Sequence, residues 1–229
     1  YLDGWAMYEC RLQREGAKQE FTACSGSAWR GGDIRGKRLL IQSEQGSGDI
    51  VQFCRYIPEL TTLGAEIIFE VPKALFALMQ TLDAPITVVA KSNSPPPVDF
   101  YCPVMSLPYV FKTTLETIPD KTPYLFCDPV KVQQWQVRLG TKNRLRVGLA
   151  WSGSAEHKED KSRSIPLALM TALTDLPVDF HSIQKEYRPY DAETLQQHLE
   201  IRQHQADLND FSDTAALIAC MDLIISVDT

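Results

Sequence analysis

The chain has 229 residues, of which 44% are hydrophobic and 23% are charged, which is the composition of an ordinary globular protein. Its formal net charge is -6 and its sequence pI is about 5.3. Because the chain is acidic and has no run of lysines or arginines, it is a poor candidate for binding nucleic acid or an anionic membrane surface. We recognise no signal peptide and no apolar run near the ~18 residues of a membrane span, so we expect a cytoplasmic protein.

Residues 1–20 carry aromatic and apolar side chains at helical spacing, and residues 21–37 are rich in glycine and serine. We interpret residues 1–32 as the helical tail of a repeat module followed by a loop. From Arg38 onward, short apolar runs alternate with helical stretches, which indicates a parallel sheet with crossover helices. The predicted strands are 38–42, 65–70, 86–90 and a weaker 98–102, and the predicted helices are 49–62 and 72–81. This pattern predicts an N-terminal Rossmann-like domain over residues 33–128, with strand 38–42 at the centre of its sheet.

Prolines break the pattern around residues 106–128, and a polar helix is predicted over 129–139. We interpret residues 129–144 as a helical linker between two domains. The alternation then restarts, with predicted strands 146–151, 180–183, 199–201 and 222–227, and predicted helices 166–173 and 211–220. Residues 145–229 are therefore predicted to be a second Rossmann-like domain. Because both ends of the sequence look like cuts through a longer protein, we expect this second domain to be incomplete here.

The stretch from Glu44 to Phe53 follows the first predicted strand and leads into a predicted helix. Gly46 and Gly48 would allow positive φ angles and a close approach of a ligand to the backbone. The N–H groups of the first helical turn would make a place for an anion, and Asp49 sits in that turn. A two-glycine loop is a weak motif by itself, and a simple turn with a helix cap remains an alternative interpretation.

The sequence contains several motifs that resemble one family. Residues 44–56, with Glu44-Gln45-Gly-x-Gly48-Asp49, resemble a signature of bacterial tetratricopeptide-repeat proteins that carry a glycosyltransferase-like domain. These proteins are related to the heptosyltransferases of glycosyltransferase family 9 and, distantly, to O-linked N-acetylglucosamine transferase. The further blocks that carry the resemblance are Gly148–Gly153, Asp160–Pro166, Ser182–Lys185, Asp213–Ile218, Asp222–Thr229 and the segment from Trp5 to Arg11.

The resemblance implies a GT-B architecture, in which two Rossmann-like domains face each other across a cleft. It also implies an inverting, metal-independent transfer of a sugar from a nucleotide-sugar, with the acceptor on the N-terminal domain and the donor on the C-terminal domain. The nucleotide-sugar would be a substrate, and no cofactor is implied. The acceptor, whether a protein or a glycan, is not identified by the sequence. We expect the full-length protein to be a hexosyl- or heptosyl-type transferase and this fragment to be inactive by itself.

Glycosyl transfer needs a base for the acceptor's proton and positive groups for the diphosphate that leaves. The resemblance makes Asp49 the candidate base, with Gly46, Gly48 and Gln52 beside it. A helix N-terminus keeps a carboxylate ionised but makes it a weaker base, so a capping or substrate-orienting role for Asp49 stays open.

On the second domain, Arg163 and Lys185 are the candidates for holding the diphosphate, because guanidinium and ammonium groups both pair with phosphate oxygens. Each one could instead be an ordinary surface cation. Ser152 and Gly153 end a predicted strand and could lend backbone N–H groups to the same phosphates. Trp151, at the same strand end, could place its ring beside a base or sugar, although a core or cleft-lining role stays open for it. The resemblance adds the residues Gln184, Asp228 and Thr229.

Other chemistry has less support in the sequence. No Asp-x-Asp, His-Glu-x-x-His or Gly-x-x-x-x-Gly-Lys-Ser/Thr motif is present, so we expect no metal site. The six cysteines lack Cys-x-x-Cys spacing, which favours free thiols in a reducing cytosol over a zinc site or a disulfide framework. The third glycine of the dinucleotide fingerprint is missing, so NAD is a weak alternative. A non-catalytic binding or scaffold module beside the repeats is the main alternative to an enzyme.

Overall fold

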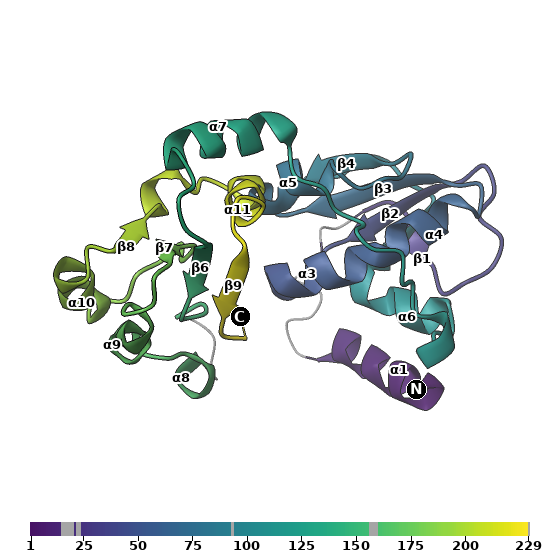
Figure 1. The fold of residues 1–229 in the computed structure, drawn as a ribbon. Coiled ribbons are helices and arrows are strands. Elements are labelled where there is room, and N and C mark those ends of the chain that lie inside the picture. Colours follow the sequence, from purple (N-terminus) through teal and green to yellow (C-terminus); the bar gives the residue numbers. More distant parts are fainter. Residues whose placement is uncertain (15–20, 22–23, 93, 156–159, 229) are drawn as a thin grey trace. The chain divides into compact units, whose positions relative to one another are not determined.

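The computed structural model describes residues 1–14, 21, 24–92, 94–155 and 160–228. The chain divides into two compact units, unit 1 over Tyr1–Phe126 and unit 2 over Cys127–Thr229. Within the described residues, each unit contains one sheet whose paired strands are all parallel (Figure 1). The prediction of an α/β fold with two parallel sheets is therefore confirmed.

The sheet of unit 1 has the strand order β1-β5-β2-β3-β4. Strand β2 is its central strand, and Leu39, Leu40 and Ile41 are completely buried there. An unbroken apolar run is what a parallel strand covered on both faces requires, so the prediction of a central strand at 38–42 is confirmed. The strand bounds are β1 Ser27–Ala28, β2 Arg38–Gln42, β3 Glu66–Val71, β4 Thr87–Ala90 and β5 Phe100–Pro103.

The helices of unit 1 are short. The predicted helix 49–62 consists of α3 (Ser47–Phe53), the 3-10 turn η2 (Cys54–Tyr56) and α4 (Ile57–Thr61). Pro58 lies in the first turn of α4, where the missing N–H of proline costs least, so a new helix begins there. The other helical elements are α5 Lys73–Met79, η3 Val104–Ser106, α6 Leu107–Val110 and η4 Leu115–Thr117.

The N-terminal helix packs on unit 1. It comprises α1 (Leu2–Tyr8), which contacts α6, and η1 (Glu9–Gln13). The Trp5 indole N–H donates to the Thr113 carbonyl at 3.0 Å. The Arg11 guanidinium donates twice to the Glu44 carboxylate, at 2.9 Å and 2.7 Å, and their side chains are only 8% and 2% exposed. This buried pair fastens the N-terminal segment to the end of β2.

The sheet of unit 2 has the strand order β8-β7-β6-β9. Its strands are β6 Arg146–Ala150, β7 Asp179–Ser182, β8 Ile201–Gln203 and β9 Leu223–Ser226. Its helical elements are α7 Pro129–Leu139, α8 Asp160–Arg163, α9 Leu167–Met170, η5 Thr171–Leu173, α10 Asp191–Gln197, η6 Gln205–Asp207 and α11 Phe211–Ile218. Helix α7 has the bounds predicted from the sequence, whereas α10 was not predicted.

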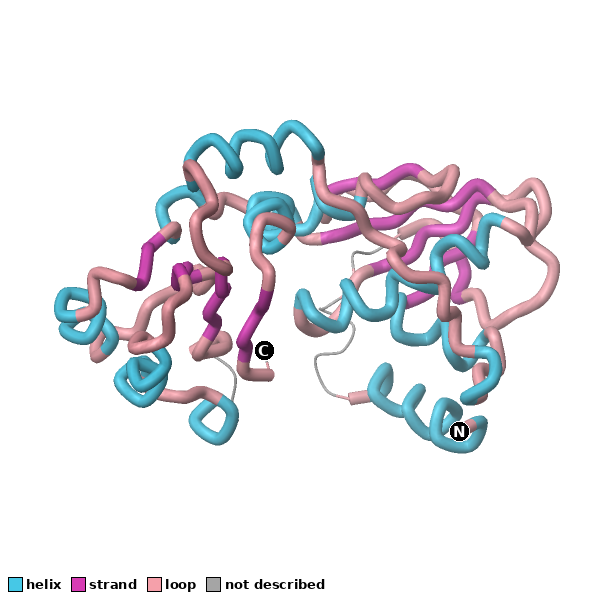
Figure 2. The backbone as a smooth tube through the Cα atoms, viewed as in Figure 1, coloured by secondary structure: helices cyan, strands magenta, loops and turns pink. Residues whose placement is uncertain are grey.

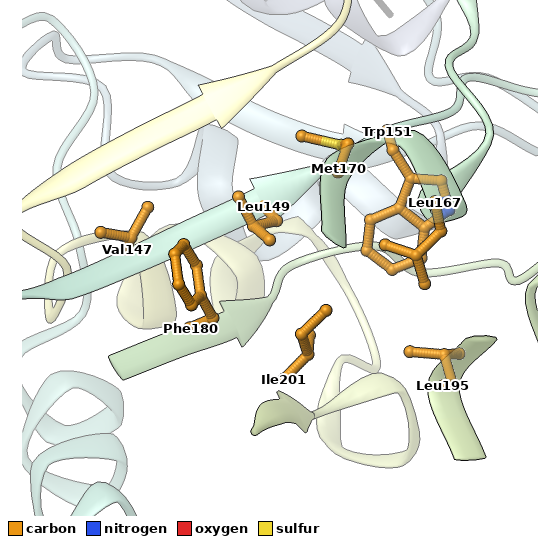
Figure 3. Packing of buried hydrophobic residues seen from close by; sticks show 8 residues of the cluster. All are labelled: Val147, Leu149, Trp151, Leu167, Met170, Phe180, Leu195 and Ile201. Carbon is orange, nitrogen blue, oxygen red and sulfur yellow. The ribbon is translucent and has the colours of Figure 1, made fainter. Parts of the chain in front are cut away.

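Two apolar clusters cover the two faces of this sheet. One cluster joins β6, β7 and β8 to α9 and α10, and its eight buried members are shown in Figure 3. The other joins α7 to α11. Gly148 on β6 faces the second cluster, because a Cβ atom there would lie 2.6 Å from Ile224 Cδ1 and 3.3 Å from Ile183 Cγ2.

Helix α7 packs against α11, as Figure 2 shows, although the sequence suggested a linker over 129–144. The Lys131 ammonium lies 2.7 Å from the Asp213 carboxylate in the first turn of α11. Asp210 caps the same helix by accepting N–H bonds from Ser212 and Asp213. Helix α7 is therefore an integral part of unit 2.

Candidate functional site

Three strands of unit 2 end at the same edge of the sheet. Because the pairing is parallel, Ala150 at the end of β6 lies beside Ser226 of β9, and Leu149 lies beside Ser182 of β7. The residues that follow these strands include most of the predicted donor-side residues, namely Trp151, Ser152, Gly153, Gln184, Lys185 and Asp228. Ligands of open α/β sheets bind at the carboxyl ends of the strands, so this edge is the candidate site. Thr229 lies outside the described residues.

Trp151 belongs to the core. Its side chain is fully buried in the cluster of Figure 3, its indole N–H donates to Asp191 Oδ2 at 3.0 Å, and its ring stacks on Tyr187. Of the two roles that the sequence left open, the structure shows the core role, in which the Trp151 ring anchors the start of the loop after β6.

Gln184 holds the same loop. Its side-chain oxygen accepts the N–H groups of Trp151 and Ser152, both at 3.1 Å, and its amide nitrogen donates to the Ser152 carbonyl at 2.8 Å. The Gly153 N–H donates to the Ser164 hydroxyl at 3.2 Å. The backbone N–H groups that we expected to bind phosphate are thus used within the protein, which makes Gln184 a residue that shapes the loop.

Arg163, at the end of α8, lies over Gly153. A Cβ atom on residue 153 would be 2.6 Å from Arg163 Nη2, so only glycine allows the guanidinium to lie this close to the backbone. The Arg163 Nε has no hydrogen-bond partner in the described part of the chain, and it lies 4.0 Å from Asp160 Oδ1. The side chain is 19% exposed. Arg163 is therefore a largely buried cation with incomplete pairing, and an anion would complete it.

Sequence reasoning missed Arg188, which lies between β7 and α10. Its Nη2 donates to Asp160 Oδ2 at 2.6 Å and to the Gly153 carbonyl at 2.8 Å, and its side chain is 11% exposed. Two guanidinium groups thus lie at Gly153, and Arg188 is the one that hydrogen-bonds to Asp160. In the sequence, Arg188 is only a basic residue that follows a predicted strand, and its contact with Asp160 is visible only in the fold.

Lys185 was the second predicted phosphate cation. It is exposed, and its Nζ donates to the Gln205 carbonyl at a long 3.4 Å. Gln205 follows β8, whereas Arg163 lies over the loop that follows β6. The cation that accompanies Arg163 at Gly153 is therefore Arg188, and Lys185 bonds elsewhere.

In unit 1, the loop after β2 differs in detail from the expected glycine turn. Gly46 is the N-cap of α3 with a φ of -81°, and Gly48 lies inside the helix. The positive φ, 59°, is at Gln45. The positive φ that the sequence allowed at Gly46 and Gly48 occurs at neither glycine, because the helix begins two residues earlier than expected.

Asp49 is half-buried in the first turn of α3, and its Oδ2 accepts the Gly46 N–H at 3.0 Å. This bond closes the N-terminus of the helix, which is the capping role left open by the sequence. Gln52 is exposed on the same helix. Unit 1 also has a cavity of about 210 Å³ between η1, the end of β5 and α6, with Trp29, Tyr101 and Tyr109 in its wall. Asp49 is not among the residues that line it.

The described residues contain no group of three or more His, Cys, Asp or Glu side chains that would hold a metal ion. None of their helices has the length and hydrophobicity needed to cross a bilayer. All six cysteines are free thiols.

No family model matches the chain. Protein FlbA of Caulobacter vibrioides (strain ATCC 19089 / CIP 103742 / CB 15) is 28% identical over 249 residues, and the match covers 97% of this chain. The chain spans 41% of the length of FlbA. This relative's name carries no statement about chemistry.

The crystal structure of the glycosyl transferase family 9 from Veillonella parvula DSM 2008 has a similar fold, with a TM-score of 0.57. The match covers 86% of this chain and 77% of that chain, at 12% sequence identity. The likeness shows that the chain has a GT-B-like glycosyltransferase fold. At this identity the likeness concerns the fold alone, and activity must be argued from the site.

Proposed function

We propose that the chain is the sugar-transferring region of a glycosyltransferase that uses a nucleotide-sugar, and that unit 2 holds the donor's diphosphate. The observation that carries this proposal is Arg163. Its guanidinium lies against Gly153 at the carboxyl edge of the sheet, and its Nε has no hydrogen-bond partner among the described residues. The Nε itself is buried, so a diphosphate oxygen would pair with the exposed part of this guanidinium, through a charge-assisted hydrogen bond.

The chemistry follows from what such a donor needs. The bond between the sugar's anomeric carbon and the diphosphate breaks as the acceptor hydroxyl attacks, so negative charge develops on the leaving diphosphate. A fixed guanidinium at that point stabilises the developing charge without reorganising during the reaction. In an inverting enzyme this is one displacement on the anomeric carbon, and the acceptor's proton goes to a base.

Asp49 is the base in this proposal. The Gly46 N–H occupies its Oδ2, and among the described contacts Oδ1 accepts no hydrogen bond. The cap therefore fixes the orientation of the carboxylate, as a positioned base requires. The transfer would proceed without a metal ion or another cofactor, with Arg163 carrying the phosphate charge. The acceptor is a hydroxyl group of a protein or a glycan.

A non-catalytic binding or scaffold module is the second candidate, and one observation favours it. The Asp49 hydrogen bond to Gly46 is a sufficient reason for an aspartate at this position, because it satisfies an N–H group at the helix terminus. In this alternative, the fold is kept for its surface and no sugar is transferred.

Calorimetric titration of the intact protein with UDP, GDP and ADP separates the two candidates. The glycosyltransferase proposal expects one of the three to bind with a Kd in the micromolar to millimolar range, with and without EDTA. Absence of binding to all three nucleotides would support the scaffold. Binding that vanished in EDTA and returned with Mn²⁺ or Mg²⁺ would contradict metal independence.

A further inference from the structure

A chain of buried polar contacts runs behind Arg163 in unit 2. The Asp191 carboxylate, 1% exposed, accepts the Trp151 indole N–H at 3.0 Å and the Arg188 backbone N–H at 2.9 Å. The Arg188 side chain then reaches Asp160 at 2.6 Å and the Gly153 carbonyl at 2.8 Å. These contacts join the loop after β6 to the start of α8 and to the start of α10.

The Asp160 carboxylate is paired much more closely with Arg188 than with Arg163. Asp160 Oδ2 has a short ion pair with Arg188, and its Oδ1 accepts the Ser164 hydroxyl at 2.8 Å. Arg163 Nε is 4.0 Å from the same carboxylate, beyond hydrogen-bond distance. The Asp160 side chain is 14% exposed, so it needs a cation nearby. While Arg188 supplies that cation, Arg163 stays available.

We infer that Arg188 is a positioning residue for the anion site, an inference that rests on the proposed function of Arg163. Arg188 neutralises Asp160 and thereby prevents Arg163 from turning onto that carboxylate. Without Arg188, Asp160 would be a largely buried charge with Arg163 as its nearest described cation. Arg163 would then pair with Asp160 and leave its place over Gly153.

Arg188 acts through Arg163, with no phosphate contact of its own. Its Nη2 already makes two short hydrogen bonds within the protein, and its side chain is less exposed than that of Arg163, 11% against 19%. A phosphate bound to Arg188 Nη2 would have to displace Asp160 or the Gly153 carbonyl. This distinction gives the inference its test.

The experiment measures the affinity of the intact protein for inorganic pyrophosphate, the group that nucleotide-diphosphate sugars share, and for UDP as a second probe. For Arg188→Gln we expect a loss of about tenfold or more, the scale of one charge-assisted hydrogen bond. Asp160→Asn added to Arg188→Gln should restore the affinity to within about threefold of wild type, because no carboxylate then competes for Arg163. Arg188→Lys keeps the positive charge, so its affinity should stay within about threefold of wild type. It is also the variant to use if Arg188→Gln does not fold.

The restored double variant is the decisive result. A merely structural role predicts that removing Asp160 as well makes binding and thermal stability worse, and this outcome would overturn the inference. In an Arg163→Gln background, Arg188→Gln should cause no further loss, and an additive loss would show that Arg188 contacts phosphate directly. If Arg163→Gln leaves affinity unchanged, the assignment of the anion site fails and the positioning role fails with it. If Arg163→Gln loses affinity while Arg188→Gln does not, only the positioning role is refuted.

Discussion

The loops after β2 and β6 occupy the same place in their two sheets, yet their polar groups are used differently. After β2, the acidic side chains are paired with groups of the protein itself. Asp49 closes its own helix through Gly46, and Glu44 is held by Arg11. After β6, the backbone N–H groups are paired by Gln184 and Ser164, and the Arg163 guanidinium is left incompletely paired.

This comparison shows that the residues that make a motif recognisable in the sequence need not be the ones that are free to bind a ligand. The glycines and acidic residues after β2 form the most recognisable motif, but their observed contacts are those of a helix cap and a buried ion pair. The loop after β6 has weaker sequence features. Its incomplete pairing arises only when α8 and the segment after β7 fold against it.

The largest expected effect concerns Glu44. Glu44→Ala removes two hydrogen bonds from the buried Arg11, which keeps Glu9 as its remaining carboxylate, and leaves the Met105 N–H without its acceptor. We therefore expect the free energy of unfolding of unit 1 to fall by about 2–4 kcal/mol. Glu66→Ala is the matched control, because Glu66 pairs with Arg38 at 3.4 Å on the surface, and its loss should cost about 0.5 kcal/mol or less. Urea denaturation measures both. Equal effects of the two variants would show that the buried pair does not fasten the N-terminal segment.

Asp49→Asn distinguishes capping from catalysis in the loop after β2. Asparagine also accepts the Gly46 N–H, so the free energy of unfolding should change by less than ~1 kcal/mol. If Asp49 is the base, turnover of the intact enzyme should fall by ~10²–10⁴-fold with nucleotide affinity unchanged. Steady-state kinetics and calorimetry give these values. Unchanged turnover would reduce Asp49 to a cap, and weaker nucleotide binding would make it a ligand-orienting residue.

Mild acid should lower the stability of unit 2 more than that of unit 1, because all four histidines of the sequence fall within the range of unit 2. His181 Nδ1 and His204 Nε2 form a buried hydrogen bond of 3.0 Å. Burial, the neighbouring His204 and the cations Arg202 and Arg146 lower the pKa of His181 to about 4, against the opposing effect of Asp179. Burial lowers the pKa of His204 as well.

The unfolded chain therefore binds more protons than the folded chain between pH ~6.5 and ~4, so the stability of unit 2 falls as the pH falls through this window. We expect a loss of about 1–3 kcal/mol. The lowered pKa values of Asp210 and Asp213 remove their contributions only below about pH 4. Thermal melts of His181→Gln should show a flatter pH dependence in this window, and the control His198→Asn, at a partly exposed position, should match wild type. A wild-type slope in His181→Gln would contradict this account.

The smallest expected effect is that of Lys185. Its ammonium is exposed and makes only a long bond to Gln205, so Lys185→Gln should change nucleotide affinity by about twofold or less. Titration with UDP measures this. A loss of affinity as large as that of an Arg163 variant would support the prediction from the sequence that Arg163 and Lys185 both hold the diphosphate.

The sequence predicted elements whose signals are local. Helix α7 has Pro129 in its first turn, and Gly140, whose φ is 71°, caps its C-terminus after Leu139; both residue types mark a helix end in the sequence. Strand β1 could not be predicted, because Ser27 and Ala28 are exposed and show no apolar alternation. The link between Arg188 and Asp160 spans 28 residues and exists only in the fold. Local chemistry thus determines helices and strands, whereas the pairing of each charge depends on tertiary contacts.

The central claim is that Arg163, at the loop after β6, holds the donor's diphosphate. Its most direct test is a calorimetric titration of the intact protein and its Arg163→Gln variant with pyrophosphate and UDP, with Lys185→Gln as control. We predict that Arg163→Gln raises the Kd for both ligands by about 10- to 100-fold, while the melting temperature stays close to that of wild type. An unchanged Kd in Arg163→Gln would contradict the claim.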